Sequence, residues 1–248
     1  MRTRTDFDDT LDSNFLLSVE ILKDSIDKGS YVRNIKSIIS TAKLDFTSPI
    51  TFFTGENGSG KSTMLEALAV SLGFNPEGGT KNYNFATHES HSTLYDAVRI
   101  ARGYRKVEWG YFLRAESFYN VATAETEYGK LAKTPPEDLH KMSHGESFLS
   151  VAGKHFKPNG LYLLDEPEAA LSPQNQLALA YQIFEATKNG AQFIIASHSP
   201  VLLALPGADI MLFDDNGISR IKYEETESYK VTKMVLEDKD RVFNYLLD

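Results

Sequence analysis

The chain contains, at residues 55–62, the run Gly55-Glu56-Asn57-Gly58-Ser59-Gly60-Lys61-Ser62. This run matches the phosphate-loop pattern G-x-x-x-x-G-K-[ST] at every fixed position. Its glycines allow successive backbone N–H groups to curve around phosphate oxygens without a clash at Cβ. Residues 50–54 before it are continuously apolar and predict a buried strand, and apolar residues at helical spacing follow it. A strand, a glycine-rich loop and a helix in this order favour a phosphate site over a turn that binds nothing.

The polar residues of this loop have expected tasks. The Lys61 ammonium is expected to reach the β- and γ-phosphates of a nucleotide, and the Ser62 hydroxyl to bind the Mg²⁺ that bridges them. Thr63 follows in the first turn of the helix, where the partial positive charge of the helix N-terminus attracts phosphate. We therefore expect residues 55–63 to bind nucleotide.

Two adjacent acids end a second apolar run, residues 161–164. Asp165, at the tip of the expected strand, has the chemistry needed to order Mg²⁺. Glu166 is expected to point elsewhere, because side chains alternate along a strand, and so to act as general base on the attacking water. The alternative is a solvated acidic turn, and the phosphate loop upstream argues against it.

Three further motifs follow in a fixed order, and with them the chain resembles the ATP-binding cassette (ABC) ATPases. Residues 142–147 resemble the signature segment of that family, with Ser143 and Gly145 matching and His144 and Glu146 departing from it. Residues 166–172 resemble the D-loop. Residues 196–200 resemble the switch segment, with His198 as its histidine. The resemblance spans residues from about 32 to 213.

This resemblance implies a mechanism and a partner. Two cassettes pack head to tail around two ATP molecules, so that Ser143 and Gly145 of one copy face the γ-phosphate held by the other. His198 then hydrogen-bonds the γ-phosphate; the alternative is a structural core histidine. The family's glutamine loop has no clear counterpart: Glu116 is one candidate, and a salt bridge between Arg114 and Glu116 is the other interpretation.

The pattern of strands and helices predicts an α/β fold, with a mostly parallel core sheet flanked by helices and an additional antiparallel β part. We expect one domain over residues 1–248, with residues 1–14 flexible. A hairpin is expected at residues 210–221, and two helices close the chain. Further strands are expected at residues 15–22, 31–39, 42–46, 109–113 and 192–196, and helices at residues 94–102 and 173–189.

Composition excludes several classes of protein. The net charge of −8 and the pI near 5.3 argue against a surface that is basic throughout. The absence of cysteine excludes a disulfide scaffold, a thiol nucleophile and a cysteine zinc site. No apolar run approaches the roughly 18 residues that a membrane span needs. A cytoplasmic protein without a membrane partner is therefore expected.

Among the ABC-type ATPases, the chain looks more like SMC- and RecF-type heads, and like small stand-alone bacterial AAA/ABC ATPases, than like transporter subunits. We expect Mg²⁺-dependent ATP hydrolysis by a homodimer that switches an unidentified protein partner. The alternatives are a DNA-repair or defence ATPase, a transporter energy subunit, and a nucleotide-binding regulator with negligible turnover. A basic stretch could touch nucleic acid or be a solvated helix face: Arg99, Arg102, Arg105 and Lys106.

Overall fold

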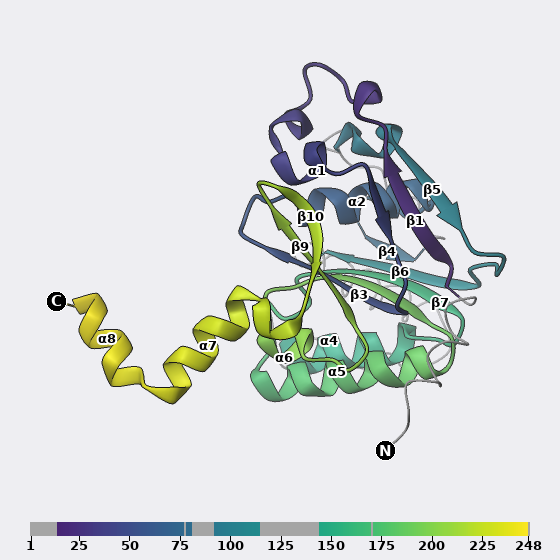
Figure 1. Ribbon diagram of the computed structural model, residues 1–248. Helices are drawn as coiled ribbons and strands as arrows, with labels where there is room; N and C mark the ends of the chain where they lie inside the picture. Colours follow the sequence, from purple (N-terminus) through teal and green to yellow (C-terminus); the bar gives the residue numbers. More distant parts are fainter. Residues whose placement is uncertain (1–13, 77, 81–91, 115–143, 170, 248) are drawn as a thin grey trace.

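The structure is a computed structural model that describes residues 14–76, 78–80, 92–114, 144–169 and 171–247 (Figure 1). Its centre is a seven-stranded sheet in the order β10-β9-β3-β8-β7-β6-β4. The five strands from β9 to β6 run parallel, whereas β10 and β4 are antiparallel to their neighbours. In chain order the strands are β3 (Ile50–Gly55), β4 (Gly79–Thr80), β6 (Trp109–Arg114), β7 (Gly160–Asp165), β8 (Gln192–Ala196), β9 (Asp209–Asp214) and β10 (Gly217–Ile221).

A second, antiparallel sheet has the order β2-β1-β5, with β1 at Leu16–Ile21, β2 at Lys43–Asp45 and β5 at Val98–Arg102. Helix α2 (Lys61–Ser71) lies between the two sheets (Figure 1). It is buried around most of its circumference, as a helix with a core on both sides should be. The predicted parallel α/β sheet with an additional antiparallel part is confirmed.

The opposite face of the central sheet is covered by α4 (His144–His155), α5 (Pro173–Lys188) and α6 (Pro200–Leu203) (Figure 1). Apolar side chains fill both faces of the sheet, in one cluster toward α2 and another toward α5. Strands buried on both faces need near-continuous apolar sequence, which is why β3, β7 and β8 were recognisable. In the described part of the chain, no helix combines the length and apolar character that crossing a membrane requires.

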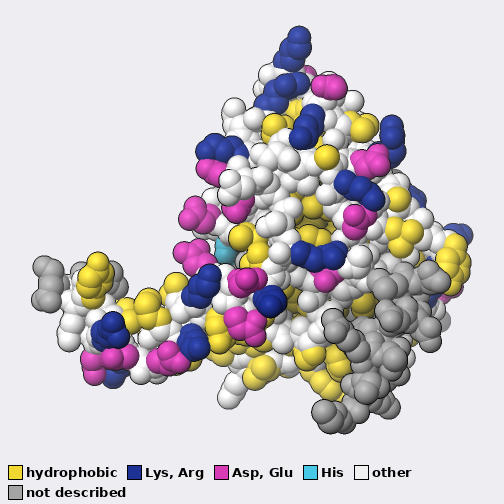
Figure 2. All heavy atoms as spheres, in the orientation of Figure 1, with side chains coloured by type: hydrophobic (Ala, Val, Ile, Leu, Met, Phe, Trp, Pro, Cys, Tyr) yellow, Lys and Arg dark blue, Asp and Glu magenta, His cyan; other side chains and the backbone are white. Residues whose placement is uncertain are grey.

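The C-terminal helices α7 (Glu227–Glu237) and α8 (Lys239–Leu247) project from this body (Figure 1). None of the α7 side chains is buried. Figure 2 shows hydrophobic side chains along this projection. The large exposed ones are Val231, Met234, Leu236, Phe243, Tyr245 and Leu247.

Two of the predicted elements are wrong. Residues 31–39 form a 3-10 helix at Tyr31–Asn34 and helix α1 (Lys36–Ser40) instead of a strand, because the Ser30 hydroxyl caps this segment at the Val32 amide. Residues 94–102 are a 3-10 helix at Thr93–Ala97 followed by strand β5.

The β5 error changes the interpretation of the basic stretch. Half-buried Val98 and Ile100 alternate with exposed Arg99, which is the period of a strand. Arg99 and Arg102 therefore share no helix face. The Arg99 guanidinium forms an ion pair with Glu20 on the neighbouring strand β1, at 3.3 Å. The half-buried Arg105 guanidinium lies 4.8 Å from the ring centroid of Phe15 and hydrogen-bonds Asn159, so it is a structural residue.

One buried side chain joins the two sheets. Gln192 opens β8 and is 1% exposed. Its Oε1 accepts hydrogen bonds from the amides of Phe15 (2.9 Å) and Leu16 (2.8 Å), and its Nε2 donates to the Leu16 carbonyl at 2.9 Å. The start of β1 is thus held against β8, 176 residues away in sequence.

We expect Gln192→Leu to lower the free energy of unfolding by about 2–5 kcal/mol, because it leaves two buried amides and one carbonyl without partners at about 1–3 kcal/mol each, partly relieved by relaxation. Urea unfolding measures this. Gln174→Leu, at an exposed position of α5, is the matched control and should change stability by less than about 0.5 kcal/mol. Equal stability of both variants would contradict the proposed link.

Candidate functional site

Three loops that are distant in sequence meet at one edge of the central sheet. Strands β3, β8 and β7 are adjacent and parallel, so their carboxyl ends lie together. Residues 55–62 follow β3, Asp165 and Glu166 end and follow β7, and His198 follows β8. Ligands of open parallel sheets bind at this edge. The structure therefore brings together the phosphate loop, the two acids and the histidine.

Two glycines of the loop are required by close packing. Gly55 has φ 141°, and a Cβ there would lie 2.3 Å from the carbonyl oxygen of Phe213. Gly60 has φ 99°, and a Cβ there would lie 2.6 Å from Cγ2 of Ile35. Both combine a left-handed backbone with a lack of space, so larger residues would displace the loop. The loop is consequently held between α1 and β9.

The Lys61 side chain is folded back onto this loop. The residue is 4% exposed, and its ammonium donates to the carbonyls of Gly55 and Glu56, both at 2.8 Å. Burial lowers the pKa of Lys61, while the charges of Glu166 and Asp165 act in the opposite direction. A desolvated cation whose partners are neutral carbonyls can exchange them for phosphate oxygens with a gain in electrostatic energy.

Ser62 and Asp165 offer two oxygens at one point. The Ser62 hydroxyl donates to Oδ1 of Asp165 at 2.9 Å. Burial raises the pKa of Asp165 to about 6, whereas the Ser62 hydrogen bond opposes the rise and the Glu166 charge adds to it. Hydroxyl and carboxylate oxygens are the donors that Mg²⁺ prefers, and the side chain is ionised at neutral pH. These residues therefore fit the ion that the phosphate loop implies.

Glu166 has an unusual backbone. Its φ is 47°, in the left-handed region that a residue with a long side chain rarely adopts. Its amide donates to the Ala196 carbonyl at 2.9 Å, and Oε1 lies 3.9 Å from Nε2 of His198. Because β7 ends at Asp165, this turn sets the direction of Glu166, and strand alternation does not. Such outliers are costly and concentrate at functional sites.

The surroundings of His198 favour the neutral form of its imidazole. Burial lowers its pKa, the Lys61 charge lowers it further, and Glu166 opposes both. Within the described residues its Nε2 is buried and has no hydrogen-bond partner. A neutral imidazole can donate from one ring nitrogen, so this group is able to hydrogen-bond a phosphate oxygen.

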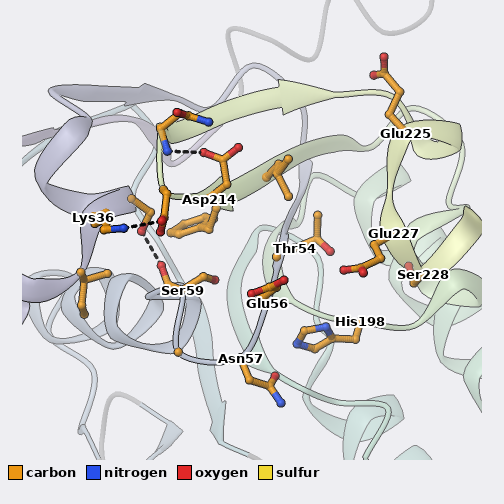
Figure 3. A pocket seen from close by; sticks show the side chains of 18 of the residues that line it. Lys36, Thr54, Glu56, Asn57, Ser59, His198, Asp214, Glu225, Glu227 and Ser228 are labelled. Atoms are coloured by element: carbon orange, nitrogen blue, oxygen red, sulfur yellow. Dashed lines mark hydrogen bonds and ion pairs between the residues drawn. The ribbon is translucent and has the colours of Figure 1, made fainter. Parts of the chain in front are cut away.

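A cavity of about 910 Å³ lies beside the phosphate loop and His198. Figure 3 shows part of its walls: α1 contributes Lys36, the end of β9 contributes Asp214, and the start of α7 contributes Glu227. This volume is within the range of ligand pockets. Sequence motifs did not indicate these wall residues, because they come from elements up to about 170 positions from the loop.

An ion pair between a half-buried arginine and a buried glutamate was not predicted either. Arg114, at the end of β6, lies 3.2 Å from Oε2 of Glu66 on α2, whose Oε1 accepts from the Ser92 amide at 3.0 Å. Arg114 therefore has Glu66 as a partner. Apolar periodicity alone suggested no role for Glu66.

Some predicted residues cannot be placed. Ser143 and Glu116 lie outside the described residues. Gly145 is the second residue of α4, and the structure does not describe the side chains next to it.

Two family models match the chain. One, described as "AAA domain", matches residues 31–145, and one described as "AAA domain, putative AbiEii toxin, Type IV TA system" matches residues 147–204. Together they span the phosphate loop, the two acids and His198.

Relatives are similar in part. An uncharacterized ABC transporter ATP-binding protein of Haemophilus influenzae is 27% identical over 183 residues, 64% of this chain and 68% of that protein. Structural maintenance of chromosomes protein 4 of Dictyostelium discoideum is 46% identical over 66 residues, 25% of this chain but 5% of that protein. A nucleotide-free ATP-binding cassette from an ABC transporter shares the fold, with TM-score 0.51, 15% identity, and coverage of 90% of this chain and 96% of that one.

The raised pKa of Asp165 predicts a pH-dependent cost in stability. Between pH 3.8 and about 6 the folded protein retains a proton that the unfolded chain has lost, so raising the pH lowers the free energy of unfolding. We expect Asp165→Asn to raise that free energy by about 1–3 kcal/mol at pH 7.5, and the gain to vanish near pH 4.

Denaturant unfolding at both pH values measures this effect. Asp240→Asn, at an exposed position of α8, is the matched control and should change stability little at either pH. An Asp165→Asn variant no more stable than the unaltered protein at pH 7.5 would contradict the assignment.

Proposed function

The chain belongs to the AAA/ABC-type P-loop ATPases, and we propose that it binds Mg-ATP at the edge formed by β3, β8 and β7 and hydrolyses it. One observation carries this proposal: the Ser62–Asp165 hydrogen bond lies beside the buried Lys61 ammonium, with Glu166 and His198 adjacent. That set contains a group for each requirement of phosphoryl transfer to water.

The phosphate loop and Lys61 bind the triphosphate in this proposal. Backbone N–H groups of residues 55–60 surround the phosphates, together with the side chains of Asn57 and Ser59 and the helix N-terminus at Ser62 and Thr63. The Ser59 hydroxyl is buried without a partner among the described residues, so it is free to donate. Ser62 and Asp165 would hold Mg²⁺, which would supply positive charge to the phosphate oxygens.

Glu166 and His198 act on the reacting groups. The Glu166 carboxylate accepts a proton from the attacking water, and its partial exposure gives that water access. His198 donates a hydrogen bond to the γ-phosphate and stabilises the charge of the transferring group. A second copy supplies Ser143 and Gly145 from its signature segment, so turnover requires a homodimer, and the change of state switches a protein partner.

Glu166→Gln should retain Mg-ATP binding, lower turnover by about 10²–10⁴-fold and accumulate the dimer, because the amide cannot accept the proton. Light scattering with and without Mg-ATP, beside a hydrolysis assay, measures both effects. Glu185→Gln on α5 is the matched control and should hydrolyse ATP normally.

Normal hydrolysis by Glu166→Gln would contradict the assignment of the base. If the unaltered protein binds nucleotide but does not hydrolyse it, the result would instead favour the alternative of a nucleotide-binding regulator with negligible turnover. The alternative of a transporter energy subunit is supported by the similarity to the Haemophilus influenzae protein, which is named as an ABC transporter ATP-binding protein.

A second candidate function is an ATPase that acts on nucleic acid. It is supported by the local similarity to a structural maintenance of chromosomes protein and by the exposed Arg102 and Lys106. Arg105 is unsuitable for a test, because it packs on Phe15.

This candidate predicts salt-dependent binding of duplex DNA that weakens by more than tenfold in Arg102→Glu/Lys106→Glu, since phosphate contacts dominate such affinity. Fluorescence anisotropy at 50 and 200 mM salt measures it, with Lys233→Glu/Lys239→Glu, at exposed positions of α7 and α8, as the control for net charge. Absence of binding at 50 mM salt would exclude this function.

A further inference from the structure

The carboxylate of Glu168 joins the two segments that carry Glu166 and His198. Its Oε1 accepts three hydrogen bonds: from the Ser197 hydroxyl at 2.8 Å, the His198 amide at 2.6 Å and the Ser199 amide at 3.2 Å. All three donors lie between the end of β8 and α6. Glu168 itself lies in the turn after β7, which the Ala169 amide closes on the Glu166 carbonyl at 3.1 Å.

We propose that Glu168 is a positioning residue that holds His198 against Glu166 at the reacting centre. The proposal rests on the function proposed above. An ionised carboxylate forms shorter and stronger hydrogen bonds than a neutral acceptor, so a single oxygen can fix a backbone segment. Because the His198 amide is one of the donors, the position of its ring depends directly on this carboxylate.

The sheet does not need this bridge. Strands β7 and β8 are paired up to Asp165 and Ala196, and the Glu166 amide extends the pairing by donating to the Ala196 carbonyl. The far end of the switch segment is fixed separately, because the Ser199 hydroxyl donates to Oε1 of Gln176 at 2.6 Å and caps α6. What Glu168 adds is the placement of the residues between, and His198 is the central one.

Its charge has a second effect on the site. The Glu168 carboxylate raises the pKa of His198 and of Lys61, opposing the burial that lowers both. Its Oε2 is buried without a hydrogen-bond partner among the described residues. Removing the Glu168 charge should therefore lower the titration midpoint of the His198 ring.

Two variants of Glu168 separate the effect of its side-chain length from the effect of its charge. Glu168→Gln keeps the length of the side chain and removes its charge, whereas Glu168→Asp keeps the charge and shortens the side chain. In both we expect the single-turnover rate of hydrolysis to fall by about 10–100-fold, as small misplacements of reacting groups do. The Kd for Mg-ATP should stay within about twofold, because the loss is in the transition state. Glu185→Gln is the matched control and should change neither.

Two measurements on His198 give readouts that a merely structural role would not move. In proton NMR, with the ring signal assigned by its loss in His198→Gln, the titration midpoint should fall in Glu168→Gln. Hydrogen exchange of the His198 amide should accelerate in both Glu168 variants. Full hydrolysis rates in both variants would overturn the proposal, as would a rate loss matched by an equal loss of ATP affinity.

The failure of this proposal can be told apart from the failure of the proposed function. If the unaltered protein does not hydrolyse ATP, the proposed function fails. Amide exchange at His198 then decides the positioning role alone: acceleration in the Glu168 variants supports it, and unchanged exchange overturns it.

Discussion

The parallel pairing of β3, β8 and β7 is the constraint on which the candidate site depends. In this register Ala196 of β8 lies opposite both Phe53 of β3 and Asp165 of β7. Strands β7 and β8 therefore end level with each other, β3 ends two residues further on at Gly55, and the loops that follow the three strands meet. Burial on both faces stabilises these strands, so polar groups occur mainly where the strands end.

Those polar ends carry costs that a ligand would offset. Burial raises the pKa of Asp165 and lowers the pKa of Lys61, so in both residues the charged form is disfavoured. Glu166 adopts a left-handed backbone. Each feature disfavours the ligand-free folded state, and phosphate with a divalent cation would relieve the first two. Any ligand that binds only the folded state stabilises it by mass action. Stability and function are thus coupled at this edge of the sheet.

The elements that could be predicted from sequence are those whose signal is local. The phosphate loop, the acids after β7 and the apolar runs of β3, β7 and β8 were predicted because each is a short contiguous pattern. The predictions for residues 31–39 and 94–102 were wrong. In such short segments a serine-capped helical turn was mistaken for a strand, and the weak period of two of a strand was mistaken for a helix. Long-range bonds explain the rest: Gln192 to Leu16, Arg114 to Glu66, and Glu168 to the switch segment have no local pattern.

The central claim is that Lys61 and Mg²⁺ act on a triphosphate at this edge. Steady-state ATP hydrolysis by the purified chain, with Mg²⁺ or with a chelator and beside a Lys61→Met variant, tests it most directly. The account predicts turnover that needs Mg²⁺ and is lost in Lys61→Met, because no other cation of the described site is buried against the loop carbonyls. Turnover that persists in the chelator or in the variant would contradict it.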